Sequence, residues 1–184
     1  PPRSADGGMA SIPVTLRYNQ TARALHWIIA ALIVLNLITG LLGETLEELN
    51  IPTPSHLATG ILILLLSLVR LGWRLNWRVP PYPADFSPLM RTVSRWTHRG
   101  FYALMIVMPL TGWIFTSASK YPISLYGLFL WPKLPLTKAM PIVGAAAEAH
   151  EILGYGFAAL AALHIGAALY HHFKLKDQVL QRML

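Results

Sequence analysis

Two histidines, His150 and His164, lie in an otherwise apolar, Ala-rich stretch that runs from Glu148 to His172. Imidazole is both a metal ligand and a proton carrier, and an ionisable side chain inside an apolar helix is usually functional. The two are fourteen residues apart, which places them on nearly the same helix face and roughly 21 Å apart along the axis. Either one alone could be an ordinary hydrogen-bonded core residue. Together they predict two ligand positions at two depths of one helix.

The composition is that of an integral membrane protein. The 184-residue chain is 54% hydrophobic but only 12% charged, whereas soluble domains average about 25% charged residues. Apolar segments long enough to cross a bilayer as helices run from about 24–43, 56–75, 96–116 and 148–172. We therefore predict an all-α fold, an integral membrane four-helix bundle formed by residues 15–184 and preceded by an N-terminal tail at 1–14.

Composition also excludes several kinds of site. The chain has no cysteine, which rules out disulfides, thiolate metal sites and iron–sulfur clusters. A metal or haem iron would therefore have to be held by His or Met. The formal net charge of +7 could indicate nucleic-acid binding. However, the basic residues flank the apolar spans and do not form a soluble basic patch, so we expect no nucleic acid as a partner.

The connections between the spans differ in character. An acidic loop with Glu44, Glu47 and Glu48 follows the first span, and a Pro-rich irregular loop at 79–88 follows the second. The connection at 117–147 is long and rich in proline and aromatic residues, which favours a segment that lies on the membrane surface.

Basic residues predict the orientation of the bundle. With four spans, the two termini and the middle loop share one side of the membrane. That side carries twelve Lys and Arg residues and the other side three. Because basic residues concentrate in the cytoplasmic loops of membrane proteins, we expect both termini to be cytoplasmic.

The direction of each span sets the depth of its histidines. His26 begins the first span on the cytoplasmic side, whereas His56 begins the second span on the opposite side. The fourth span also starts opposite the cytoplasm, which places His150 at the depth of His56 and His164 nearer that of His26. Charge and hydropathy alone thus predict two facing pairs, His56 with His150 and His26 with His164.

Two imidazoles that face each other across a bundle core can act as the axial ligands of a haem. They could also be half of a zinc site, but no further His, Asp, Glu or Cys completes a tetrahedron at either depth. A haem also needs flat space, and each of the four histidines has a small residue four positions later. These small residues are Ala30, Gly60, Gly154 and Ala168.

The remaining histidines lack this pattern. His98 is followed four residues later by Tyr102, and His171 and His172 lie in the solvated interface at the end of the last span. We expect none of the three to be a ligand. Arg70, near the cytoplasmic pair, is a candidate partner for a haem propionate; alternatively, it is an arginine that only anchors the end of its span.

Several motifs, taken in order along roughly residues 16–184, resemble the bacterial cytochrome b561 family. They are Ala-Leu-His-Trp at 24–27, Arg-Leu-Gly-Trp-Arg at 70–74, Met-Pro-Leu-Thr-Gly-Trp at 108–113, Ser-Ala at 117–118, Tyr-Pro at 121–122, His-Glu at 150–151 and Ala-Leu-His-Ile-Gly-Ala-Ala-Leu-Tyr-His-His-Phe at 162–173. The resemblance implies four transmembrane helices in a bacterial inner membrane. It also implies two haem b groups with His26, His56, His150 and His164 as axial ligands.

The member type resembled here is a superoxide oxidase, which passes electrons from periplasmic superoxide through the haems to ubiquinone. We expect superoxide to be steered by Lys120, Lys133 and Lys138 on the periplasmic side; the alternative is that these are ordinary solvated lysines.

Quinone should bind where a haem edge meets lipid, and Arg95, Trp96 and His98 are the candidate residues. Two other functions stay open. One is a membrane-anchor cytochrome that passes electrons between quinone and a partner dehydrogenase or hydrogenase. The other is a His-lined metal transporter without haem, which a visible spectrum would distinguish.

Overall fold

The computed structural model describes residues 17–184 except 52, 54, 78, 84 and 85, so the predicted N-terminal tail at 1–14 lies outside the described part. The elements in chain order are α1 (Gln20–Leu41), α2 (Gly43–Glu48), α3 (His56–Asn76), α4 (Pro88–Ser117), β1 (Ile123–Leu125), β2 (Phe129–Trp131), α5 (Pro141–Tyr170), the π-helical turn η2 (His171–Leu175) and the 3-10 turn η3 (Leu180–Arg182).

Four helices, α1, α3, α4 and α5, are long and apolar enough to cross a membrane within the described residues. Their outward faces are apolar. On α5, for example, Ile152 and Leu163 are each 71% exposed. Exposure of so much apolar surface to water along the whole bundle would be unfavourable, whereas the hydrocarbon core of a bilayer covers it. The predicted four-helix membrane bundle is confirmed.

Two of the spanning helices begin well before the predicted positions. α4 begins at Pro88, where Ser87 caps the helix by accepting a hydrogen bond from the Met90 backbone N–H at 3.2 Å. α5 likewise begins with a proline, Pro141. Proline suits the first helical turn because the N–H that it lacks would have no helical partner there. For α4, hydropathy alone misses the start because the first turns carry Arg91 and Arg95.

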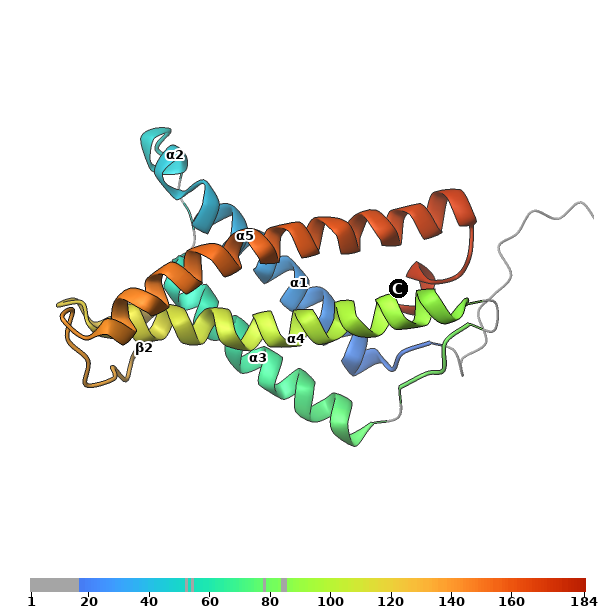
Figure 1. Ribbon diagram of the computed structural model, residues 1–184, viewed down its shortest axis with the longest axis horizontal. Helices are drawn as coiled ribbons and strands as arrows, with labels where there is room; N and C mark the ends of the chain where they lie inside the picture. The colour runs from blue at the N-terminus through green and yellow to red at the C-terminus, as the bar shows by residue number, and fades with distance from the viewer. Residues whose placement is uncertain (1–16, 52, 54, 78, 84–85) are drawn as a thin grey trace, which may run out of the picture.

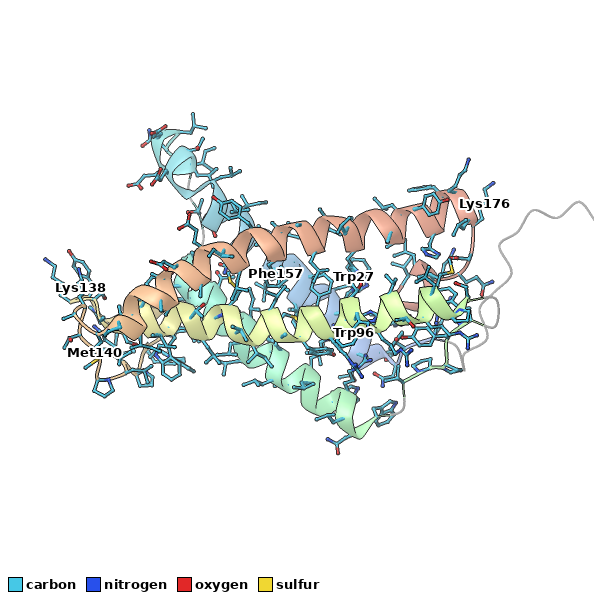
Figure 2. The ribbon with its side chains drawn as sticks, in the orientation of Figure 1. Trp27, Trp96, Lys138, Met140, Phe157 and Lys176 are labelled. Atoms are coloured by element: carbon cyan, nitrogen blue, oxygen red, sulfur yellow. The ribbon has the colours of Figure 1, made fainter. Side chains whose placement is uncertain are left out.

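The helices pack as two pairs, α1 with α3 and α4 with α5, and α3 joins the pairs through α4. Figure 1 shows α4 and α5 running side by side along the length of the molecule. Between them, Phe157 points inward from α5 (Figure 2). It belongs to an apolar core at mid-height of the bundle whose buried members are Ile29, Ile33, Ile63, Met105 and Phe157.

Two short elements were not predicted. The acidic loop after α1 contains the helix α2, which projects away from the bundle in Figure 1. The long connection after α4 contains an antiparallel hairpin in which Ile123 pairs with Trp131. The strands are joined by the three residues 126–128, of which Tyr126 (52°) and Gly127 (75°) have positive φ, and the Leu128 N–H donates to the Leu125 carbonyl at 3.0 Å. The segment predicted as a connection on the membrane surface thus contains a short hairpin, and the fold remains that of a helical bundle.

The hairpin closes one end of the bundle, which we call the hairpin end. Ile123 is fully buried against the start of α3, and the Tyr126 hydroxyl lies 2.6 Å from Thr59 Oγ1. At the opposite end, called here the terminal end, the chain folds back after α5. There the Trp27 indole N–H donates to the Met183 carbonyl at 2.7 Å. Figure 2 shows Lys138 and Lys176 at these two ends of the molecule.

Candidate functional site

Four half-buried histidines meet as two pairs at two levels of the bundle. At the hairpin end, the ring centroids of His56 on α3 and His150 on α5 are 6.0 Å apart, with the ring planes at 78°. At the terminal end, the centroids of His26 on α1 and His164 on α5 are 6.4 Å apart, with the planes at 80°. The structure therefore brings together the two sets of side chains that charge and hydropathy had paired.

The spacing within each pair fits one metal ion between two imidazoles. A ring nitrogen lies about 2 Å from a metal that it binds and about 1 Å from its own ring centroid, so two imidazoles on opposite sides of a metal have centroids about 6 Å apart. Both observed distances agree with this value. No group of three or more His, Asp or Glu side chains that could hold a metal ion is found among the described residues, so the pairs are the sites to consider.

The imidazole of His56, on α3, is held in place by the neighbouring helix α1. Its Nδ1 lies 3.1 Å from the Asn36 carbonyl oxygen and 3.3 Å from Thr39 Oγ1. A carbonyl oxygen only accepts, so Nδ1 carries the proton and Nε2 keeps the free lone pair that a metal needs. A Cβ added at Gly40 would stand 2.8 Å from His56 Cε1. Only glycine lets the ring approach this closely.

His150 is fixed in the same way by α4. Its Nδ1 lies 3.0 Å from the Met108 carbonyl oxygen and 3.1 Å from Thr111 Oγ1. The Thr111 hydroxyl itself donates to the Met108 carbonyl at 2.7 Å. A Cβ added at Gly112 would stand 3.1 Å from His150 Cε1. Each imidazole of the hairpin-end pair thus sits in a carbonyl–threonine–glycine cradle on a neighbouring helix.

Sequence reasoning missed these cradles. Their signal is the dipeptide Thr-Gly, which occurs three times in the chain, at 39–40, 59–60 and 111–112. The copies at 39–40 and 111–112 each lie near the end of a span, at the depth of His56 and His150, whereas the copy at 59–60 follows His56 on its own helix. The dipeptide by itself is therefore ambiguous, and position along the span separates the two copies that face the ligand pair.

Open space adjoins the hairpin-end pair, as a flat cofactor requires. A Cβ added at Gly60 would meet only Asn36 Nδ2 at 3.6 Å, and one added at Gly154 would meet only Met108 Cε at 3.8 Å. At neither glycine does the backbone of a neighbouring helix approach closely. The side-chain oxygen of Asn36 is buried without a hydrogen-bond partner among the described residues. A buried polar atom of this kind is rare, and as an acceptor it can take a hydrogen bond from a donor on a bound group.

The terminal-end pair has different surroundings. Among the described residues, no hydrogen bond reaches the ring nitrogens of His26 or His164. Arg70 is within electrostatic range of both rings, and its Nε donates to the Tyr102 hydroxyl at 3.3 Å. His98 lies as near to His164 as His26 does, with ring centroids 6.2 Å apart. Distance from His164 therefore does not by itself decide whether His26 or His98 is the second ligand beside it.

Two cavities at the terminal end carry arginines. One, of about 890 Å³, lies between the first residues of α1 and the last turns of α3 and includes Arg17, Arg23, Arg70 and Arg74 in its lining. The other, of about 380 Å³, lies between α3 and α4 and is lined by Leu71, Arg74, Leu75, Arg95, His98, Arg99 and Tyr102. Of the three quinone candidates, Arg95 and His98 thus line the second of these cavities, whereas Trp96 lines neither of the two. Trp96 is 64% exposed and stacks under Arg99.

The three lysines lie at the hairpin end, and two of them gather around one tyrosine. Lys120 Nζ stands 5.2 Å from the ring centroid of Tyr121, and the Lys133 ammonium donates to the Ser119 and Tyr121 carbonyls. Lys138 is exposed farther along the same connection. The last two histidines are away from both pairs. His171 contacts Asp177 and Phe86, and the ring of His172 makes an edge-to-face contact with Phe173.

Comparison with known proteins gives a consistent result. The family described as prokaryotic cytochrome b561 matches residues 17–184. The chain is 31% identical over 176 residues to "Cytochrome b561 homolog 2" of Escherichia coli (strain K12), covering 91% of each chain. It is 25% identical over 178 residues to "Cytochrome b562" of Cereibacter sphaeroides, covering 91% of this chain and 94% of the other. It is 28% identical over 129 residues to "Probable superoxide oxidase CybB" of Yersinia pestis, covering 70% and 72% respectively.

Four apolar spans with imidazole pairs inside them define a class, the multi-pass membrane cytochromes. Within that class, the chain belongs to the prokaryotic cytochrome b561 family. It is therefore a transmembrane electron-transfer protein of a bacterial membrane that binds b-type haem.

Proposed function

We propose that the chain binds two haem b groups, one between His56 and His150 and one between His26 and His164, and that it conducts electrons between the two membrane surfaces. The spacing of about 6 Å within both pairs carries this proposal. The four histidines would hold the two groups, and haem b held by two imidazoles would supply one-electron transfer. The chain's task is to hold the pairs at two depths, and the apolar core between the levels keeps water out.

The electron donor is superoxide at the periplasmic surface, and the acceptor is ubiquinone. The hairpin end faces the periplasm in this account, because most of the basic residues lie at the terminal end and basic residues favour the cytoplasm. Two superoxide anions each lose one electron and leave as dioxygen. One quinone gains the two electrons and two protons to give the quinol. The name of the Yersinia pestis relative, with 28% identity, supports this choice of donor.

Steering of superoxide depends on the local field at the hairpin. Lys120 and Lys133 lie together on the connection that covers the start of α3, the helix whose first residue is His56. The glutamates of α2 also belong to this end, but α2 projects away from the bundle (Figure 1). An anion that approaches the hairpin should therefore meet the ammonium groups first.

The test is superoxide-driven reduction of a soluble ubiquinone analogue by the purified, haem-loaded protein. At low ionic strength, replacing Lys120, Lys133 and Lys138 together by Gln should lower the second-order rate constant with superoxide about tenfold, and salt should remove the difference. The matched control replaces the same three residues by Arg, which keeps the charge. A rate that rises with added salt would mean that the glutamates dominate the field and would contradict steering.

The same assay separates this function from its rivals. A protein with both haems and no superoxide activity in isolation would contradict the proposal and favour a membrane-anchor role with a partner dehydrogenase. A protein that shows no Soret band when expressed with ample haem would favour metal transport.

Quinone binds at the cavity between α3 and α4, next to the terminal-end pair. His98 stands between that cavity and His164, so it can hydrogen-bond a quinone carbonyl and deliver a proton. His98→Ala should keep both haems and raise the KM for quinone about tenfold, whereas His26→Ala should lose the terminal-end haem. Loss of a haem in the His98 variant would reassign the ligand of His164 and contradict this placement.

A further inference from the structure

The sequence contains an internal repeat that coincides with the two helix pairs. Both α1 and α4 carry the pattern Arg-x2-His-x12-Thr-Gly. Its members are Arg23, His26, Thr39 and Gly40 on α1, and Arg95, His98, Thr111 and Gly112 on α4. The shared pattern runs over 23–40 of α1 and 95–112 of α4, so it extends well beyond a chance dipeptide.

The second helix of each pair repeats as well. α3 carries His56, Gly60 and Arg70, and α5 carries His150, Gly154 and His164 at identical spacing. Since α1 packs against α3 and α4 against α5, each pair is one copy of a two-helix unit. In both copies, the first helix supplies the cradle and the second helix supplies the cradled imidazole.

The two copies are alike at the hairpin end and differ at the terminal end. At the hairpin end, both rings of the pair are bound through Nδ1 to a carbonyl and a threonine. At the terminal end, Arg70 in one copy stands where His164 stands in the other. Arginine has no lone pair to offer a metal, so only one pair can form at this end, and the Arg70 guanidinium is within electrostatic range of both of its rings.

These differences act on a bound haem in opposite directions. An imidazole that donates its second N–H to a carbonyl is a stronger electron donor to iron, which favours the oxidised state. A fixed positive charge near the iron favours the reduced state. In the hairpin-end pair, both rings donate Nδ1–H to a carbonyl. The terminal-end pair has the positive charge of Arg70 near it instead.

We propose that the repeated Thr-Gly cradles, Thr39–Gly40 and Thr111–Gly112, set the hairpin-end haem at a lower midpoint potential than the terminal-end haem. Thr39 and Thr111 are positioning residues that act through His56 and His150. Electron flow from the hairpin end to the terminal end is then downhill. The inference rests on the proposed placement of two haems.

The test is a potentiometric titration of the visible spectrum of the purified holoprotein. The variant Thr39→Val/Thr111→Val removes one of the two acceptors on each Nδ1–H and keeps the shape of the side chain. We expect the equilibrium constant for reduction of the hairpin-end haem to rise about tenfold. The lower midpoint potential should therefore shift upward by about 59 mV, the value for one electron. The upper midpoint should stay in place. The His150→Ala variant assigns the steps, because the step that it removes belongs to the hairpin end.

Three controls decide the outcome. Thr39→Ser/Thr111→Ser keeps the hydroxyls and should restore the wild-type midpoint, and Thr116→Val on α4 should leave both midpoints unchanged. Arg70→Gln should lower only the upper midpoint. If the wild type shows both haem bands and the Val variant leaves the lower midpoint unmoved, the inference is wrong. A wild type without haem would overturn the proposed function instead.

Discussion

Replacing His150 by Ala is expected to remove the hairpin-end haem and leave the terminal-end haem in place. The variant leaves His56 facing an empty position 6.0 Å from its ring centroid. Loss of a partner in the second shell of a metal site already costs roughly 10–100-fold in affinity, so loss of an axial ligand should cost more. The haem content of the purified protein, measured as the pyridine haemochrome per chain, should fall to half.

Two further variants test whether the loss of haem is specific to one pair. His164→Ala should remove the other haem and leave a protein that still shows the spectrum of the cradled pair. His172→Ala, which changes a histidine outside both pairs, should retain the full haem content. Loss of both haems in either single variant, with the α-helical circular dichroism unchanged, would show that the two levels do not bind independently.

Replacing Gly40 by Ala is expected to displace His56 and to release the hairpin-end haem. The new Cβ would stand 2.8 Å from His56 Cε1, closer than carbon atoms approach without repulsion. The ring cannot easily retreat, because Nδ1 is bound to the Asn36 carbonyl on the same helix. Gly112→Ala places its Cβ 3.1 Å from His150 Cε1 and should weaken haem binding less. The haem content after detergent purification measures both effects.

A third glycine provides the matched control. Gly166 also lies in a spanning helix, but nothing lies within 4 Å of an added Cβ there. Gly166→Ala should keep the full haem content, and it gains roughly 1 kcal/mol of helix propensity over glycine. If Gly40→Ala and Gly166→Ala retain haem equally well, the close approach of His56 to α1 does not matter for binding.

The pairing of the histidines could be predicted because it depends on quantities that a sequence contains. The rise of a helix sets the depth of His150 and His164, and the alternating direction of successive spans sets which histidines share a level. The structure places His56 beside His150 and His26 beside His164, and the four spans are present. The ligand roles themselves stay predictions.

Other features depend on interactions that hydropathy does not register. The start of α4 is set by the cap at Ser87 and by Pro88, whereas the apolar pattern begins only at Trp96. The hairpin rests on positive φ at Tyr126, where a non-glycine residue gives little signal. The closeness of His98 to His164 is set by how α4 and α5 pack, and no periodicity within one helix reveals it.

The cradles were missed for a different reason. Thr39 and Thr111 contact histidines of another helix, so their role becomes visible only when the two halves of the chain are aligned with each other as a repeat. Once α1 is set against α4 and α3 against α5, the pattern also explains Arg70, which occupies the place of a histidine. A search for repeats within the chain would have recovered this element from the sequence.

The central claim is that each of two imidazole pairs holds one haem, and the most direct test is the haem-to-chain ratio of the purified wild-type protein together with its low-temperature EPR spectrum. We expect two haem b per chain, both ferric low-spin with two histidine ligands. A single haem per chain, or a high-spin signal that accounts for one of the two, would contradict the account.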